Sequence, residues 1–285
     1  MKLVVVANEI NNLEEYIKIG ASAFIFGLYG YCSGYGRQVD ISFIKSVREK
    51  YKDIEIFVSM NKNFFNSELE NVEKMMIELN DIGVNGILYY DLSILSIKKR
   101  LNLDVDLVWN QTHMVTNYNT CNYYYDMNVK YGFLSSEITL DEINEIANNT
   151  KMKLFVNIIG YLVMSFSRRN LLNNYFLSTN KKKENNVYDI INNNEKYVIR
   201  EELNGNSIYY GRVLNGSVVI PSIDVDYLVL NEDFMDHNIF MEVLDNIHKF
   251  VSTDDSEYMR KIDSLIGDYR GFFFQKTIYK VKKNG

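Results

Sequence analysis

The sequence predicts an α/β fold that closes into a barrel, and three features lead to this prediction. Short apolar runs rich in β-branched residues alternate with amphipathic helical patterns through the first part of the chain. Near-continuous apolar runs are typical of parallel strands that are covered on both faces. The βαβ pattern repeats more than five or six times, and no Gly-x-Gly-x-x-Gly motif follows the first strand, which argues against an open doubly wound sheet. We therefore predict a TIM-barrel-like (β/α) barrel with an irregular β-rich insertion and C-terminal helices.

The strands expected in this repeat are each a short apolar run. They cover residues 2–7, 23–28, 55–60, 86–90, 105–110, 131–135 and 153–159. Capping-box spacing marks the start of three helices between them. The three pairs are Asn11 with Glu14, Ser67 with Glu70, and Thr139 with Glu142.

The pattern changes after residue 177. Residues 178–194 are rich in Asn, Lys and Ser, which predicts a long mobile surface loop. Residues 197–220 predict short β-hairpin pieces, with turns at the two Asn-Gly pairs that begin at Asn204 and Asn215. A late strand is expected at 227–230, followed by helices at about 235–250 and 257–266.

These patterns predict a single domain over residues 1–285. Its parts are the main βα repeats in 1–177, the loop and hairpin pieces in 178–226, and the closing strand, helices and tail in 227–285.

Composition and charge restrict the function. The chain has 285 residues, of which 47% are hydrophobic and 24% charged, as in an ordinary globular protein. Its net charge of −6 excludes a protein that binds nucleic acid through an overall basic excess, so RNA contact would need a local patch. Two such patches occur, and their alternative interpretation is solvated surface lysines: Lys181, Lys182 and Lys183, and Lys276, Lys280, Lys282 and Lys283.

The cysteine content and the N-terminus exclude other classes. Cys32 and Cys121 are the chain's two cysteines, so a structural zinc site or a 4Fe–4S cluster held by cysteines is not expected. Asn8 and Glu9 end the first apolar run too early for a signal peptide, and no stretch is long enough for a membrane span. We expect a cytoplasmic protein without a membrane partner.

In a parallel barrel, ligands bind at the carboxyl ends of the strands, so polar residues that follow strands are candidate site residues. Glu137 lies between a strand end and a helix cap, where a carboxylate suits a general base or a hydroxyl-binding group, and Asp91 has the same status. The alternative for Glu137 is simple neutralisation of Arg168 or Arg169. The candidate substrate-binding residues are Asn61, Asn110, Gln111, Asn117, Arg168, Arg169, Arg37 and Tyr175.

The paired arginines indicate the kind of ligand, because a guanidinium binds carboxylate or phosphate through two parallel hydrogen bonds. The glycine-rich stretch 27–37 after the second strand adds a weak indication of an anion cradle. A Gly-x-Ser-x-Gly nucleophile elbow and a His-Glu-x-x-His motif are both absent. The residues therefore favour an anionic small molecule or a phosphate-bearing ligand.

Four segments carry a family resemblance: LSSEITLDEINEI (134–146), WNQTHMVTNYNT (109–120), IIGYLVMSFSRRNLLNNYF (158–176) and the tail GFFFQKTIYKVKK (271–283). They resemble the peptidase U32 family in the short form found in Gram-positive and related bacteria. The resemblance covers most of the chain. It implies a TIM-barrel-like fold, a cytoplasmic location and, from the family name, a peptidase or collagenase-like protease.

The resemblance also implies hydroxylation chemistry, because relatives act in prephenate-dependent hydroxylation of the wobble uridine of tRNA. Several relatives hold a 4Fe–4S cluster through four cysteines after the signature turn, and those cysteines are absent here. Phe155 and Ile159 stand where the signature has a glutamate and a histidine.

Three interpretations stay open. The first is an enzyme or enzyme subunit in tRNA wobble-uridine hydroxylation or a related hydroxylation. Its pocket would bind a small carboxylate such as prephenate, as co-substrate, or an RNA phosphate, with tRNA as partner. The second is a collagenase-like peptidase. The third is a non-catalytic scaffold for a second, cluster-bearing protein of the U32 family.

Overall fold

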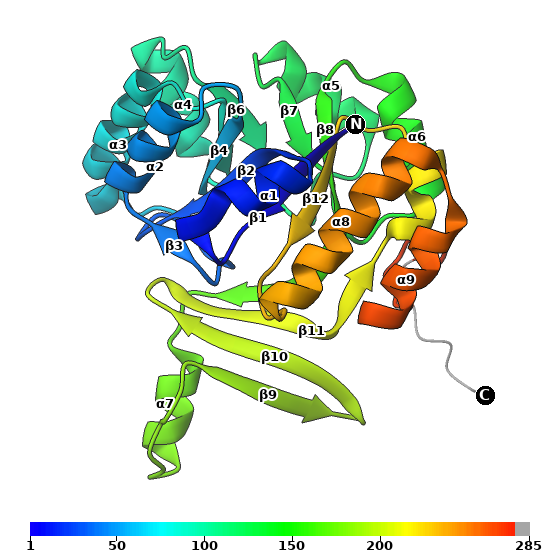
Figure 1. The fold of residues 1–285 in the computed structure, drawn as a ribbon. Coiled ribbons are helices and arrows are strands. Elements are labelled where there is room, and N and C mark those ends of the chain that lie inside the picture. Colours follow the sequence, from blue (N-terminus) through cyan, green and yellow to red (C-terminus); the bar gives the residue numbers. More distant parts are fainter. Residues whose placement is uncertain (277–285) are drawn as a thin grey trace, which may run out of the picture.

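The computed structural model describes residues 1–276 (Figure 1). Part of the tail segment quoted above, including Lys280, Lys282 and Lys283, lies outside the described residues. No helix within 1–276 is long and apolar enough to cross a membrane.

Parallel strands close into a barrel, as predicted. Strand β12 pairs in parallel with both β1 and β8, so the sheet has no free edge within the barrel. The eight barrel strands found in residues 1–276 are β1 (Lys2–Val6), β2 (Ala21–Leu28), β4 (Glu55–Met60), β5 (Gly86–Tyr89), β6 (Asp106–Trp109), β7 (Tyr131–Phe133), β8 (Lys153–Ser167) and β12 (Tyr227–Asn231). The short strand β3 (Gln38–Val39) pairs with β2.

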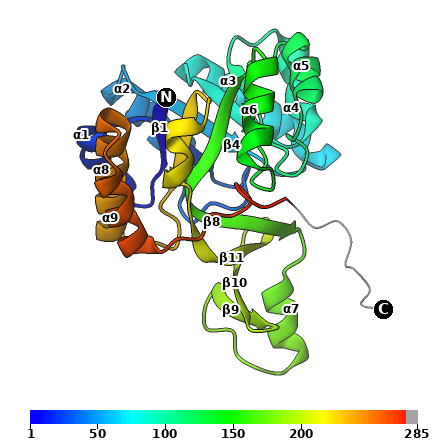
Figure 2. The ribbon, with the colours of Figure 1, turned by 90° about the vertical axis from the view of Figure 1, so that its right-hand side faces the viewer.

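Helices surround the barrel as an outer layer (Figures 1 and 2). They are η1 (Ile10–Asn12), α1 (Leu13–Ile19), α2 (Ile41–Lys50), η2 (Asn66–Glu68), α3 (Leu69–Ile82), α4 (Leu92–Leu101), α5 (Tyr118–Asp126), α6 (Leu140–Asn149), α8 (His237–Thr253) and α9 (Ser256–Ile266).

One of the three predicted capping boxes is confirmed. The Thr139 hydroxyl accepts from the Glu142 N–H, and the Glu142 carboxylate accepts from the Thr139 N–H. The predictions at Asn11 and Ser67 are wrong, because a turn of 3₁₀-helix precedes each α-helix there and moves its start.

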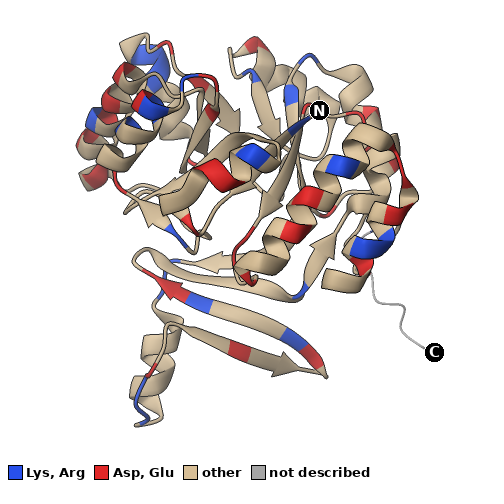
Figure 3. Ribbon diagram, in the orientation of Figure 1, with Lys and Arg blue, Asp and Glu red and all other residues tan. Residues whose placement is uncertain are grey.

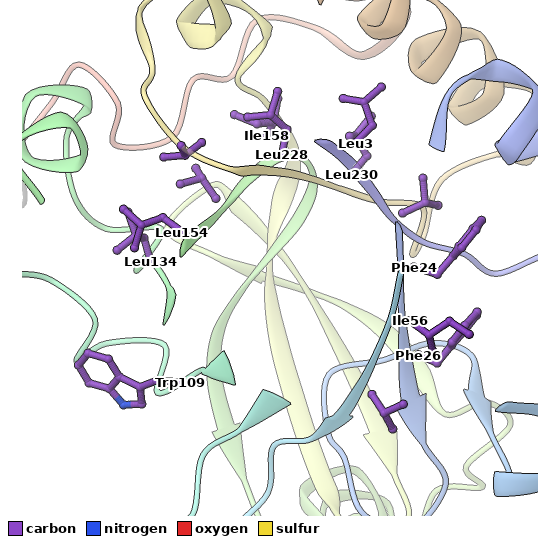
Figure 4. Packing of buried hydrophobic residues seen from close by; sticks show 14 of the residues in the cluster. Leu3, Phe24, Phe26, Ile56, Trp109, Leu134, Leu154, Ile158, Leu228 and Leu230 are labelled. Atoms are coloured by element: carbon purple, nitrogen blue, oxygen red, sulfur yellow. The ribbon is translucent and has the colours of Figure 1, made fainter. Parts of the chain in front are cut away.

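Two hydrophobic clusters hold the barrel. The inner cluster fills the space between the strands with aromatic rings, and Phe155 lies fully buried in it, stacked on Tyr227 with ring centroids 4.1 Å apart. The outer cluster lies between strands and helices and includes Phe24, Trp109 and Leu228 (Figure 4). An ionised carboxylate at position 155 would be costly in this apolar interior, so the side chain serves packing.

Strand β8 continues beyond the barrel and starts an antiparallel extension. It pairs with β11 (Gly205–Asn215), and β10 (Glu195–Glu202) and β9 (Val187–Asn192) extend the sheet outward. Helix α7 (Leu171–Ser178) and the 3₁₀-helix η3 (Ser217–Ser222) complete the connection from β8 to β12, where a barrel helix would otherwise lie. At Gly160, φ is 125° and an added Cβ would lie 2.7 Å from the Asn231 carbonyl oxygen, so glycine is required near the point where β8 leaves the barrel.

The predictions for this extension need two corrections. The prediction of a loop through 178–194 is wrong for its second part, since β9 forms there and turns into β10 through Asn193 and Asn194, both with positive φ. The turn at Asn204 is confirmed, because Glu202 pairs with Gly205 across it. The predicted hairpin turn at Asn215 is wrong, since β11 ends there and the chain enters η3.

Candidate functional site

A cavity of about 440 Å³ opens at the carboxyl ends of the barrel strands, within the usual size of a small-molecule site. One wall comes from the loop after β2, including Ser33, Gly34 and Tyr35. The residues that follow β4 to β7 and the end of β12 form further parts of its lining. The outer part of β8, residues 161–166, and Arg168 just after the strand cover it from the side of the antiparallel sheet.

Five asparagines line this cavity: Asn61, Asn63, Asn110, Asn157 and Asn231. The side-chain oxygen of Asn61 accepts from the Ser33 N–H at 3.0 Å, and that of Asn231 accepts from the Asp233 N–H at 2.9 Å. With these oxygens engaged, the amide nitrogens are the groups left to donate to a ligand. The cavity therefore offers neutral donors beside its charged groups.

Two cations line one side of the cavity and share one carboxylate. The ammonium group of buried Lys62 lies 2.7 Å from the Glu68 carboxylate and 3.2 Å from the Asn204 side-chain oxygen. The Arg168 guanidinium stacks 3.7 Å from the centroid of the Phe65 ring, with Nη2 3.7 Å from Glu68. One carboxylate facing two cations leaves this side positive, which suits an anionic ligand.

A pair of titratable side chains at the cavity comes from the segments that follow β6 and β7. Glu137 lines the cavity, and its carboxylate lies 3.8 Å from Nδ1 of His113, which also lines it. Both side chains are about half exposed. A carboxylate beside an imidazole is an arrangement that can accept and pass protons. The base function of Glu137 stays a prediction.

The remaining predicted residues do not line the cavity. Asp91 caps α4 and accepts from the Ser93 and Phe64 N–H groups, and Asn117 caps α5. Gln111 accepts from the indole N–H of Trp109 and donates to a backbone carbonyl. The last three lie at the surface, where they are exposed: Arg37, Arg169 and Tyr175. The structure thus brings together Asn61, Asn110, Glu137 and Arg168 from the predicted set.

Sequence reasoning missed several polar residues of the cavity, among them Lys62, Asn157 and Asn231. Lys62 and Asn231 each lie at or just after the end of a barrel strand. The expectation that polar residues at strand ends form the site, applied to every strand, would have included them. Asn157 is the polar residue within the apolar run of β8, and its amide donates to the Ser136 hydroxyl at 3.1 Å.

A buried ionic cluster supports the cavity wall formed by the loop after β2. Arg200 of β10 pairs with Asp233, and both side chains are less than a tenth exposed. Glu202 accepts from the Gly34 N–H at 2.9 Å. At Gly36 an added Cβ would lie 2.1 Å from the Asp233 carboxylate, so the glycine permits close approach. A carboxylate of the chain itself thus holds the glycine-rich loop in place.

The pH dependence of folding follows from Glu202. Burial raises the pKa of Glu202 from 4.5 to about 7, although the Gly34 N–H and Arg200 act against the increase. Since the folded state holds this proton more tightly, its contribution to stability is complete below pH 4.5 and is lost as the pH rises through 7. In the wild type, this loss should lower the free energy of unfolding by at most about 3 kcal/mol as the pH rises across this range. We expect Glu202→Gln to lack this decrease.

Urea denaturation at pH 5, 6, 7 and 8 measures this effect, with Glu195→Gln on the exposed end of β10 as the matched control. Parallel pH profiles for the wild type and Glu202→Gln would contradict it.

The two thiols do not fit a cluster ligand set. Cys32 lies in the inner cluster and Cys121 in the outer one. Burial raises the pKa of Cys121 to about 12 and that of Cys32 well above its ordinary value, whereas ligation requires thiolates. Within residues 1–276 no group of three or more His, Cys, Asp or Glu could hold a metal ion.

Comparison with known proteins gives a family match and two relatives. The model of peptidase family U32 matches residues 8–187. The chain is 28% identical over 220 residues to tRNA hydroxylation protein P2 of Bacillus subtilis, which covers 73% of this chain and 70% of that protein. It is 26% identical over 185 residues to an uncharacterized protease of Methanocaldococcus jannaschii, covering 61% of this chain and 44% of that protein.

Among solved structures, thiamine phosphate pyrophosphorylase from Pyrococcus furiosus is similar with a TM-score of 0.45 and 10% identity. The similarity covers 92% of this chain and 96% of that one, and at this level it supports no statement about function.

Proposed function

Because the chain belongs to peptidase family U32, we propose that it is an enzyme or enzyme subunit in the hydroxylation of the wobble uridine of tRNA. Its relative in Bacillus subtilis carries the name of a tRNA hydroxylation protein. In this proposal the cavity binds a small carboxylate co-substrate such as prephenate.

The observation that carries the proposal is the charge distribution of the cavity. Lys62 and Arg168 line one side with a single carboxylate, Glu68, between them. A carboxylate ligand gains charge-assisted hydrogen bonds there, and the asparagine amides offer donors for further oxygens. Glu137, next to His113, supplies a group that holds or moves a proton at the same ligand.

The peptidase alternative has less support in the structure. No hydrogen bond joins a serine or cysteine side chain to an imidazole anywhere in residues 1–276, so a nucleophile with its base is not assembled. Purified protein is expected to leave casein and denatured collagen intact. Reproducible cleavage that is lost in Glu137→Ala would favour the peptidase.

Mass spectrometry of tRNA nucleosides from a deletion strain tests the proposal. We expect the hydroxylated wobble uridine to disappear, to return with the wild-type gene, and to stay absent with Glu137→Gln. A deletion strain with unchanged hydroxylation would contradict the proposed function.

A non-catalytic role beside a second U32-family protein is favoured by one observation. Phe155 packs within the barrel interior, where the family signature has an acid. In that case the deletion strain still loses the hydroxylated uridine, but the Glu137→Gln gene restores hydroxylation in that strain as well as the wild-type gene does. Co-purification with the second protein would support the same conclusion.

A further inference from the structure

Residues 168–192 form an arm that connects the end of β8 to β10 and consists of α7, the loop after it and β9. The arm projects from the barrel on the side of the antiparallel sheet (Figures 1 and 2). It is fixed to β10, because Glu201 accepts from the Asn173 N–H at 3.0 Å and pairs with Lys183. The rings of Phe176 and Tyr188 also pack within it, 5.0 Å apart.

The first part of the arm is basic in a chain whose net charge is −6. Residues 168–183 contain no Asp or Glu, and their basic residues are Arg168, Arg169, Lys181, Lys182 and Lys183. Figure 3 shows basic residues near the free end of the arm. Arg169, Lys181 and Lys182 are exposed and make no ion pair with any residue of 1–276, which leaves their charges for an external anion.

Exposed aromatic rings lie among these cations. Phe65 is 60% exposed and carries the Arg168 guanidinium on its face, and Tyr175 of α7 is 53% exposed. Cations that neutralise phosphates, together with rings on which bases stack, are the combination that binds single-stranded nucleic acid. Arg168 also lines the cavity, so the arm begins at the cavity and leads outward from it.

We propose that residues 168–183 bind the phosphate backbone of the RNA substrate and lead a single-stranded segment of it to the cavity. This inference rests on the proposed function, in which the substrate is tRNA. Specific RNA recognition acts mostly on unpaired loops, and the wobble nucleotide lies in one. The exposed rings are the reason to prefer RNA over an acidic protein as the occupant.

Fluorescence anisotropy with an unmodified tRNA transcript that has uridine at the wobble position tests the arm. The variant is Arg169→Gln/Lys181→Gln/Lys182→Gln in the full chain. The matched control is Lys45→Gln/Lys99→Gln/Lys151→Gln, which changes three exposed lysines outside the arm that also lack an ion pair in residues 1–276.

We expect the arm variant to bind at least about tenfold more weakly at 100 mM salt. The slope of log affinity against log salt concentration should also become shallower, by the amount that corresponds to about two to three lost phosphate contacts. The control is expected to keep the wild-type affinity. Tyr175→Ala should weaken binding roughly fivefold or more through lost stacking.

An arm variant that binds tRNA like the wild type, with the same salt dependence, would overturn the assignment while leaving the proposed function intact. The assignment would also be overturned if the purified wild-type protein binds no tRNA although the deletion strain loses the hydroxylated uridine. In that case, loss of an acidic protein partner from the arm variant would identify the arm as a protein contact. Unchanged hydroxylation in the deletion strain would instead reject the proposed function.

Discussion

Asp233→Leu should lower the free energy of unfolding by about 3–5 kcal/mol, because it leaves the Arg200 guanidinium buried without its carboxylate. The two side chains are 8% and 6% exposed, and the guanidinium lies 4.0 Å from the ring centroid of Phe234 and 5.2 Å from that of Tyr209. Water therefore cannot replace the lost partner. Urea denaturation at pH 7 measures the change.

A double variant separates the cost of an unpaired charge from the value of the pair. We expect Arg200→Met/Asp233→Leu to be far closer to the wild type than Asp233→Leu alone, since apolar groups of similar size often replace a buried ion pair with little loss. The exposed pair Lys196 and Asp189 on the same sheet, 2.9 Å apart, is the control, and its removal should change stability little. This account would be contradicted if the double variant lost as much stability as Arg200→Met and Asp233→Leu lose in sum.

The same cluster links stability to the cavity. Asp233 follows β12, while Arg200 and Glu202 belong to β10 of the antiparallel extension. Both carboxylates contact the glycine-rich loop, one through the Gly34 N–H and the other at Gly36. Loss of the pair should therefore weaken the packing of a cavity wall as well as the attachment of the extension.

The barrel could be predicted from the sequence because its strands are continuous apolar runs. Residues 55–60 are the clearest case, since predicted and observed strand coincide. The extension could not be predicted in the same way. Beyond Gly160, β8 is held by pairing with β11, a partner more than 35 residues away in the chain, and its burial is irregular. The turn at Asn193 and Asn194 also lacks the glycine that marked the turn at Gly205.

The candidate site shows a limit of predicting site residues from the polar residues that follow barrel strands. Asn61, Asn110 and Glu137 follow strands and line the cavity. Asp91 and Gln111 follow strands too, but backbone N–H and C=O groups and the Trp109 indole take their hydrogen bonds. A sequence does not show whether a polar side chain is used by its own local backbone. Nor does it show pairs such as Arg200 with Asp233, which lie on separate elements.

Replacing both cations of the cavity should have the largest effect on ligand binding. We expect Lys62→Met/Arg168→Met to weaken the binding of prephenate by roughly 100-fold or more, since each charge-assisted hydrogen bond contributes about 1.5–3 kcal/mol. Isothermal titration calorimetry at pH 7.5 measures the affinity. Arg169→Met is the matched control, because this neighbouring arginine does not line the cavity.

Glu68 provides a test of opposite sign at the same place. Its carboxylate lies 2.7 Å from Lys62 and 3.7 Å from Arg168, so it competes with a bound anion for both cations. Although burial raises the pKa of Glu68, its bonds with Lys62 and the Phe65 N–H hold that pKa below the ordinary value, so it is ionised at neutral pH. Glu68→Gln should therefore tighten prephenate binding severalfold while the double methionine variant weakens it. Equal affinities for all three proteins would show that the ligand does not bind at these cations.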